Sequence, residues 1–206
     1  MPLESKKPPK QAEAWRLLVH EHILQSAELA QRTAEMSLDS ILGAARLITK
    51  CFQQSNKVLI CGNGGSAADA QHMAAEFVNR LSGDFERPGL PAIALTTDTS
   101  FLTAYANDFG YEGVFERQVA TLGNRGDVLL AISTSGNSRN VIKAVAAARK
   151  TRLTTIGLLG EGGPLTDLVD HAVVVQSRDT QHVQECLLTI EHSICRVVER
   201  ALFGAK

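Results

Sequence analysis

The most informative segment of the chain joins a glycine-rich turn to a histidine and a glutamate one helical turn apart. Residues 61–76 read CGNGGSAADAQHMAAE and follow the apolar run at residues 58–60. A glycine-rich turn that opens onto a helix presents backbone N–H groups and the positive end of a helix dipole to an anion. His72 and Glu76 are four residues apart, so they share one helix face. The segment therefore predicts a phosphate-type cradle beside a metal-ligand or acid–base pair.

Both halves of this segment also have a plainer interpretation. The turn at residues 62–66 tolerates positive φ at its glycines and at Asn63, and Ser66 is a candidate N-cap, but a tight turn without a ligand would use the same residues. No Gly-Lys-Ser/Thr follows and the spacing departs from the dinucleotide fingerprint, which excludes a nucleotide P-loop. A His/Glu pair at helical spacing is, taken alone, usually a surface contact.

A serine-rich loop forms the second candidate for binding a phosphate. Residues 133–138 read STSGNS and come directly after the apolar run at residues 128–132. Hydroxyl groups and turn N–H groups together can hold phosphoryl oxygens without a fixed positive charge. A solvated Ser/Gly loop is the alternative, and the repetition of the design after two strands favours phosphate binding.

The last helix carries a further pair of polar candidates, Gln184 and His192. Eight residues separate them, which is about 12 Å along a helix and about 80° around it, near the limit for two side chains meeting at one ion. The helix should be largely buried, so a core histidine is the alternative; its apolar residues are Leu187, Leu188, Ile190, Ile194 and Val197. Four other histidines lack a motif context and are expected to be structural or surface residues: His20, His22, His171 and His182.

The elements that must position these residues alternate between strand and helix. Apolar runs predict strands at residues 58–61, 92–95, 128–133, 154–159 and 172–175. Helices are expected at about 11–54 as a pair, then at 67–81, 114–122, 139–150, 166–169 and 181–202. Unbroken apolar strands that alternate with helices predict a parallel sheet covered on both faces, with ligands beyond the carboxyl ends of the strands. The polar turns at residues 62–66, 96–99 and 133–138 fall at that edge.

Composition limits the classes of function. The chain has 206 residues, 44% of them hydrophobic and 21% charged, which suits one soluble domain, expected at residues 11–206. A net charge of −1 gives no electrostatic case for nucleic acid as a partner, and no apolar run approaches the roughly 20 residues that span a membrane. Residues 1–10 are polar, so we expect a disordered tail and no secretory signal. The four cysteines show no CxxC spacing, which indicates a reduced, cytoplasmic protein.

Taken together and in this order, the motifs resemble the sugar isomerase (SIS) domain family over nearly the whole chain. The most specific parts are CGNGGS from Cys61, NDFG at residues 107–110 and GDVLLAISTSGNS at residues 126–138. The resemblance implies a three-layer α/β/α sandwich with a five-stranded parallel sheet of flavodoxin-like type. It also implies a homotetramer with active sites at subunit interfaces, and we assign the first two helices to oligomer packing.

Within the family, the chain resembles the branch that isomerises heptose phosphates. That resemblance implies conversion of D-sedoheptulose 7-phosphate to D-glycero-D-manno-heptose 7-phosphate through an enediol, for heptose in lipopolysaccharide core or another surface glycan. It implies one zinc ion per subunit, with the ligands His72, Glu76, Gln184 and His192. Glu76 and His192 would be the catalytic base and acid. The implied substrate contacts are Asn63, Gly64, Gly65, Glu76, Asn107, Asp108, Ser133, Thr134, Ser135, Ser138 and Gln184.

A sister group in the same family keeps one alternative open. These adaptors share the fold but bind the replication initiator protein without catalysis, and the chain resembles them at residues 67–72, 79–80, 91–98 and 138–140. The sister group lacks equivalents of Glu76 and His192, and both are present here, which favours the isomerase. One departure from the isomerase pattern is Gln181-His182, where an Asp-Arg pair often precedes the glutamine.

Overall fold

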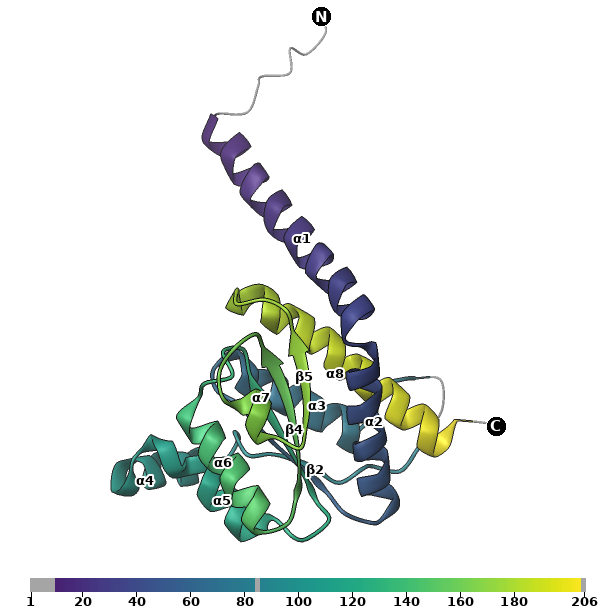
Figure 1. Cartoon of the computed structure of the whole chain (residues 1–206), viewed down its shortest axis with the longest axis vertical. Helices are drawn as coiled ribbons and strands as arrows, with labels where there is room; N and C mark the ends of the chain where they lie inside the picture. Colours follow the sequence, from purple (N-terminus) through teal and green to yellow (C-terminus); the bar gives the residue numbers. More distant parts are fainter. Residues whose placement is uncertain (1–9, 84–85, 205–206) are drawn as a thin grey trace, which may run out of the picture.

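A five-stranded parallel sheet forms the centre of the computed structural model, which describes residues 10–83 and 86–204 (Figure 1). Its strand order is β2-β1-β3-β4-β5, the order of flavodoxin. The strands are β1 (Val58–Cys61), β2 (Ala92–Ala94), β3 (Val128–Ser133), β4 (Thr154–Gly160) and β5 (His171–Val175). Each was expected within a residue or so of these bounds, and the predicted fold class is confirmed.

Helices cover both faces of this sheet. They are α1 (Lys10–Met36), α2 (Leu38–Gln53), α3 (Gly65–Val78), α4 (Thr99–Phe109), α5 (Val114–Leu122), α6 (Arg139–Lys150), α7 (Leu165–Leu168) and α8 (Thr180–Phe203), with the short 3₁₀ turn η1 (Tyr111–Gly113) before α5. Successive strand residues alternate between two cores, as the pleat requires. Ile60 and Leu130 pack under α2, α3 and α8, whereas Leu59 and Leu129 pack under α5, α6 and α7.

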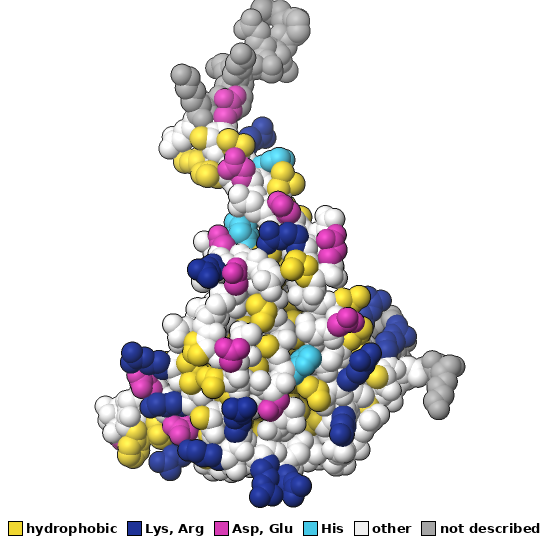
Figure 2. Space-filling view, in the orientation of Figure 1, with side chains coloured by type: hydrophobic (Ala, Val, Ile, Leu, Met, Phe, Trp, Pro, Cys, Tyr) yellow, Lys and Arg dark blue, Asp and Glu magenta, His cyan; other side chains and the backbone are white. Residues whose placement is uncertain are grey.

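The first helix projects away from the sheet (Figure 1). Only its last turns are buried, where Leu29 and Thr33 pack near α8, and much of its length exposes apolar residues such as Trp15 and Leu18. Figure 2 shows these hydrophobic side chains among charged ones along the projecting helix. Within residues 10–83 and 86–204, none of the helices is long and apolar enough to cross a membrane. The expected tail at residues 1–10 lies outside the described residues except for Lys10, which begins α1.

Helix α4 is a long element that the sequence analysis missed. None of residues 99–109 is fully buried. Leu102, Tyr105 and Ala106 nevertheless recur at helical spacing and pack, partly buried, against the core under α5 and α6. Phe101 stacks on Tyr105, and the side chain of Asp98 caps the first turn by accepting a hydrogen bond from the Phe101 amide. An apolar stripe and a cap therefore define this helix.

Candidate active site

Two helices bring His72 and His192 into contact, with their rings inclined by 69°. His72 lies on α3 and His192 on α8, and their Nε2 atoms are 2.7 Å apart. His72 Nε2 is also 3.6 Å from the Glu76 carboxylate one turn further along α3. Because both helices belong to the same chain, the three side chains meet without a second subunit. The arrangement places His72 between the imidazole of His192 and the carboxylate of Glu76.

The donor set of these three residues fits a zinc ion. Zinc takes histidine nitrogen and carboxylate oxygen at about 2.0–2.2 Å with tetrahedral geometry, which separates two ligand atoms by roughly 3.3 Å. The observed separations of 2.7 Å and 3.6 Å lie on either side of that value. The three ligand atoms are not all within 4.8 Å of one another, since among the described residues only His22, His182 and Glu185 form such a group. One shared ion would therefore require the Glu76 side chain to turn toward His192.

Two buried carboxyl groups lie in the same contact between α3 and α8. Asp69 Oδ2 and both carboxyl oxygens of Glu191 are without a hydrogen-bond partner among the described residues. Burial and the nearby Asp69 raise the pKa of Glu191 to about 9. Burial also raises the pKa of Asp69, against the hydrogen bond from Gln184 and the charge of His72. Unpartnered acid groups beside two imidazoles are groups that a bound cation would stabilise.

Gln184, the fourth ligand implied by the resemblance, lies beside Asp69. Its amide Nε2 is 3.4 Å from Asp69 Oδ1, one turn before His72 on α3. Gly65 makes this approach possible, because a Cβ at that position would collide with the Gln184 amide. The structure thus brings His72 into contact with His192 and close to Glu76, and it places Gln184 toward the start of α3. The role of all four residues as ligands stays a prediction.

The glycine-rich turn positions backbone N–H groups at the start of α3. Gly64 is the N-cap, with a φ of +56°, and no side chain caps the helix there. Ser66, the expected N-cap, lies inside the helix and is buried, so that prediction is wrong. Asn63 is held by Asn140 through two amide hydrogen bonds of 2.9 and 2.8 Å, and it accepts a third from the Tyr111 hydroxyl. The turn is therefore fixed to the start of α6.

The serine-rich loop lies at the end of β3, the neighbour of β1, so the two turns are adjacent. The hydroxyls of Ser133 and Ser138 are 3.2 Å apart, and Ser138 is the N-cap of α6 without using its side chain there. Thr134 is half-buried and Ser135 exposed. These hydroxyls and the free N–H groups at the start of α6 can receive the oxygens of a phosphate.

Asn107 and Asp108 lie apart from these turns along the chain, on exposed helix α4. Their side chains hydrogen-bond to each other at 2.9 Å. The link between α4 and the glycine-rich turn is Tyr111, which follows the helix and donates to Asn63. The assignment of Asn107 and Asp108 as substrate contacts stays a prediction.

A cavity of about 510 Å³ opens beside His192. Its other lining residues are Leu81, Ser82, Thr189, Ser193, Arg196, Glu199 and Arg200. The volume falls within the range typical of small-molecule sites. His192 is the one residue of the candidate metal cluster that lines this cavity.

A second cluster, missed by the sequence analysis, lies between α1 and the start of α8. His22, His182 and Glu185 have one ligand atom each within 4.8 Å of the others, so the group could hold a metal ion. The sequence analysis expected His22 and His182 to be structural or surface residues and did not include them among the candidate metal ligands. His182 and Glu185 are three residues apart on one helix face, but nothing in the sequence brings His22 to them, since 163 residues separate it from Glu185.

Comparison with known proteins gives one consistent family. Residues 21–160 match the model of the SIS domain. A phosphoheptose isomerase of Roseiflexus sp. (strain RS-1) is 50% identical over 186 residues, covering 90% of this chain and 93% of that protein. Phosphoheptose isomerase 2 of Campylobacter jejuni is 47% identical over 189 residues, covering 91% of this chain and 89% of that protein.

Solved structures agree with the sequence relatives. The phosphoheptose isomerase GmhA from Neisseria gonorrhoeae superimposes with a TM-score of 0.84 at 41% identity, covering 90% of this chain and 98% of that one. A phosphoheptose isomerase from Francisella tularensis gives a TM-score of 0.85 at 36% identity, covering 88% and 96%. The similarity extends over almost the full length of each protein.

Proposed function

Because this chain belongs to the SIS domain family and is an isomerase, related to the phosphoheptose isomerases, we propose that it converts D-sedoheptulose 7-phosphate to D-glycero-D-manno-heptose 7-phosphate. The observation that carries the proposal is the cluster of His72, His192 and Glu76 close to two phosphate-type turns. The product would supply heptose to lipopolysaccharide core or another surface glycan. The relatives reported above are named as isomerases, and nothing supports the adaptor alternative.

The reaction moves a proton between C1 and C2 of the sugar through an enediol. It requires a base at carbon, a proton donor at oxygen and a group that stabilises negative charge on oxygen. Glu76 is the base in this proposal, since its carboxylate faces the cluster and is partly exposed. His192 is the acid, because its Nε2 is directed into the same space and lines the neighbouring cavity.

One zinc ion per subunit would be held by His72, Glu76 and His192, with Gln184 as the fourth ligand. When bound, zinc polarises carbonyl and hydroxyl oxygens as a Lewis acid. The support from this structure is the convergence of imidazole nitrogens and a carboxylate beside unpartnered buried acids. A carboxylate or imidazole nitrogen that binds zinc cannot transfer a proton at the same time, so Glu76 and His192 would act as base and acid only while released from the ion.

The phosphate would bind at the serine-rich loop, through Ser133, Thr134, Ser135 and Ser138. The remaining proposed contacts line the sugar: Asn63, Gly64, Gly65, Asn107, Asp108 and Gln184. Binding energy gained at the distant phosphate positions the reacting carbons against Glu76 and His192. Hydroxyls and helix N–H groups supply this energy without a lysine or arginine in the loop.

We further propose a cytoplasmic homotetramer built from one SIS domain at residues 11–206. Exposed apolar side chains on α1 support an interface between chains, as Trp15, Leu18, Val19 and Ile23 are each about 60% exposed. Apolar stripes of this size on a projecting helix usually mark a contact surface. The four cysteines are free and buried, which suits a reducing compartment.

The decisive experiment incubates the purified protein with D-sedoheptulose 7-phosphate and measures the rate at which the aldose product forms. Glu76→Gln should lower kcat by about 100- to 10,000-fold, the usual contribution of a general base. Glu86→Gln is the matched control, since Glu86 is exposed and outside the cluster. Near-normal turnover by Glu76→Gln would show that another group is the base, and an inactive wild type would refute the proposed reaction.

A further inference from the structure

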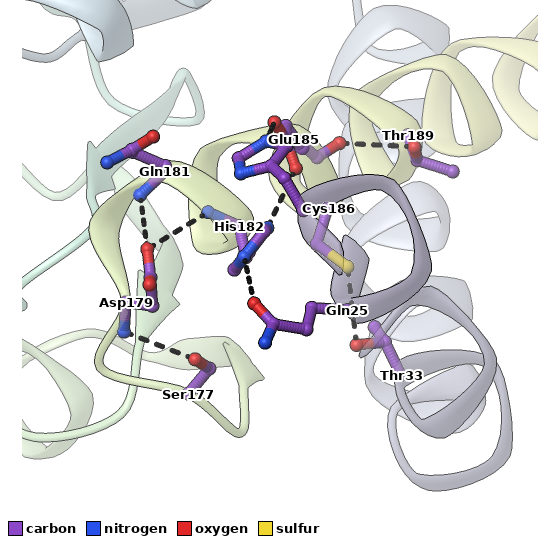
Figure 3. Close-up of polar contacts among 10 residues, drawn as sticks. Gln25, Thr33, Ser177, Asp179, Gln181, His182, Glu185, Cys186 and Thr189 are labelled. Atoms are coloured by element: carbon purple, nitrogen blue, oxygen red, sulfur yellow. Dashed lines mark hydrogen bonds and ion pairs between the residues drawn. The ribbon is translucent and has the colours of Figure 1, made fainter. Parts of the chain in front are cut away.

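The crossing of α1 over the start of α8 holds a set of side chains that the isomerase reaction does not use. The carboxylate of Glu185 lies between two imidazoles: Oε1 is 2.8 Å from His22 Nε2, and Oε2 is 3.1 Å from His182 Nδ1. The two rings are 4.4 Å apart between centroids. Figure 3 shows His182 directed toward Glu185 on one side and Gln25 on the other.

Gln25 is the outer partner of His182. Its Oε1 lies 3.3 Å from His182 Nε2. With the amide in this orientation Nε2 donates, and a neutral ring presents the lone pair of Nδ1 to the Glu185 carboxylate. Two acceptors that face each other are the arrangement that a bound cation stabilises.

The charge of the cluster is compatible with a divalent ion. A carboxylate with two imidazolium rings has the same net charge, +1, as a carboxylate with two neutral rings and one divalent metal.

We propose that His22, His182 and Glu185 bind a divalent transition metal, zinc in the first place, at the contact between α1 and α8. Two imidazole nitrogens and one carboxylate oxygen are a donor set that suits zinc and disfavours magnesium or calcium. Gln25 is the outer partner that holds His182 in the required orientation. Three protein ligands leave one position for water, in agreement with the partial exposure of His22 and Glu185.

A cavity beside the proposed site would let an ion enter, and the bound ion would join two helices. A cavity of about 260 Å³ lies beside His182, bounded also by Gln25, Glu28 and Asp179. The bound metal would join residues 163 positions apart in the chain and fasten the projecting helix to the helix that carries Gln184 and His192. This site is additional to the zinc proposed for catalysis.

The test counts zinc in the full-length protein after chelator treatment and equilibrium dialysis against zinc chloride. The wild type should bind two ions per chain, and both His22→Asn and His72→Asn should bind one. His20→Asn, an exposed histidine on the same helix, is the matched control and should bind two. If the catalytic zinc were absent but this site real, the wild type would bind one ion and His22→Asn none. Equal binding by His22→Asn and the wild type would overturn the proposal.

Two further variants test the role assigned to Gln25. Gln25→Leu should weaken zinc binding at this site by about 10- to 100-fold, the usual effect of losing an outer-shell partner. Gln25→Glu keeps an acceptor for His182 Nε2 and should bind zinc at least as tightly as the wild type. His22→Asn should also lose part of the rise in melting temperature that zinc gives the wild type, while isomerase turnover is retained. Unchanged affinity in Gln25→Leu would refute the orientation of His182 on which the site depends.

Discussion

His72 Nε2 and His192 Nε2 lie 2.7 Å apart although 120 residues separate them in the chain. The contact exists because α3 and α8 pack side by side over the same face of the sheet, through residues such as Met73, Phe77 and Ile194. Among the described residues, the other polar contact of this pair joins His72 to Glu76, one turn further along α3. The chemistry of the site therefore depends on the packing of two helices, and changes in that packing should be detectable in activity.

Replacement of His192 should remove both the proposed acid and a metal ligand. We expect His192→Asn to lower kcat by about 100- to 10,000-fold and to reduce zinc binding at the active site. Glu86 is exposed and lies outside the cluster and the cavity, so Glu86→Gln is the control. Steady-state kinetics and metal analysis on the same preparations give the result. A His192→Asn enzyme that keeps its turnover would remove this residue from the mechanism.

A methyl group at Gly160 should disturb the serine-rich loop. A Cβ at this position would collide with the backbone carbonyl of Thr134, which cannot move aside as a side-chain tip can. Gly160→Ala should therefore raise KM for the sugar phosphate by at least about tenfold and change kcat less, because phosphate binding is weakened in ground and transition states alike. Gly83→Ala, where a Cβ meets open space, is the control. A normal KM in Gly160→Ala would place the phosphate elsewhere.

Arg87 should stabilise the end of α3 that carries Glu76. Its fully buried guanidinium donates to the Glu199 carboxylate at 2.7 Å and to the backbone carbonyls of Glu76 and Phe77. Arg87→Met leaves a buried carboxylate without its partner, which should lower the free energy of unfolding by about 3–5 kcal/mol. Urea denaturation measures this loss. Arg139→Met breaks an exposed ion pair and should cost no more than about 1 kcal/mol.

The same ion pair predicts a dependence of stability on pH. Burial opposes ionisation of Glu199, but hydrogen bonds from Leu81 and Arg87 outweigh it and hold its pKa below the usual value. A lowered pKa in the folded state means that the contribution is present above the unfolded pKa and is lost as pH falls through the folded pKa. The stability difference between wild type and Arg87→Met should therefore shrink below about pH 4. If the stability difference between wild type and Arg87→Met were the same below pH 4, the lowered pKa of Glu199 would be contradicted.

The apolar stripe on α1 should hold chains together. Trp15, Val19 and Ile23 lie at intervals of four residues and line one exposed groove. Val19→Asp places a charge in the middle of this stripe, so the assembly should fall from four chains to a smaller form in size-exclusion chromatography with light scattering. Glu21→Gln on the same helix should leave the mass unchanged. A Val19→Asp protein that is still tetrameric would exclude this stripe as the interface.

Sequence patterns predict the sheet well because its strands are buried on both faces. Val58–Cys61 and Val128–Ser133 are apolar without interruption and were expected at these bounds. Helix α4 was missed although Leu102, Tyr105 and Ala106 recur at helical spacing, because these side chains are only partly buried against the core. Asn107 and Asp108 lie on this helix, so their place in the fold was missed with it.

The candidate site was predictable where its residues are neighbours in sequence. Helical spacing joins His72 to Glu76, and strand ends identify the two phosphate-type turns. The resemblance, and not the spacing, connected this pair to His192. The cluster of His22, His182 and Glu185 escaped because its members come together only through the crossing of α1 and α8, which no local pattern encodes. For Gln184, the resemblance implies a role as a metal ligand, but it does not predict the contact with Asp69. That contact depends on the close packing of the Gln184 side chain against Gly65.

The position of α8 at residues 180–203 also has a consequence for biosynthesis. At about 5–20 residues per second, a ribosome adds His192 roughly 6–24 s after His72. During that interval the apolar surface later covered by Ile190, Ile194 and Val198 remains accessible to chaperones and proteases. A chain whose translation stops before α8 has the complete sheet and both phosphate-type turns but lacks the second histidine. In the proposed mechanism, His192 joins the site only when α8 docks, so catalytic competence would be acquired in this late step.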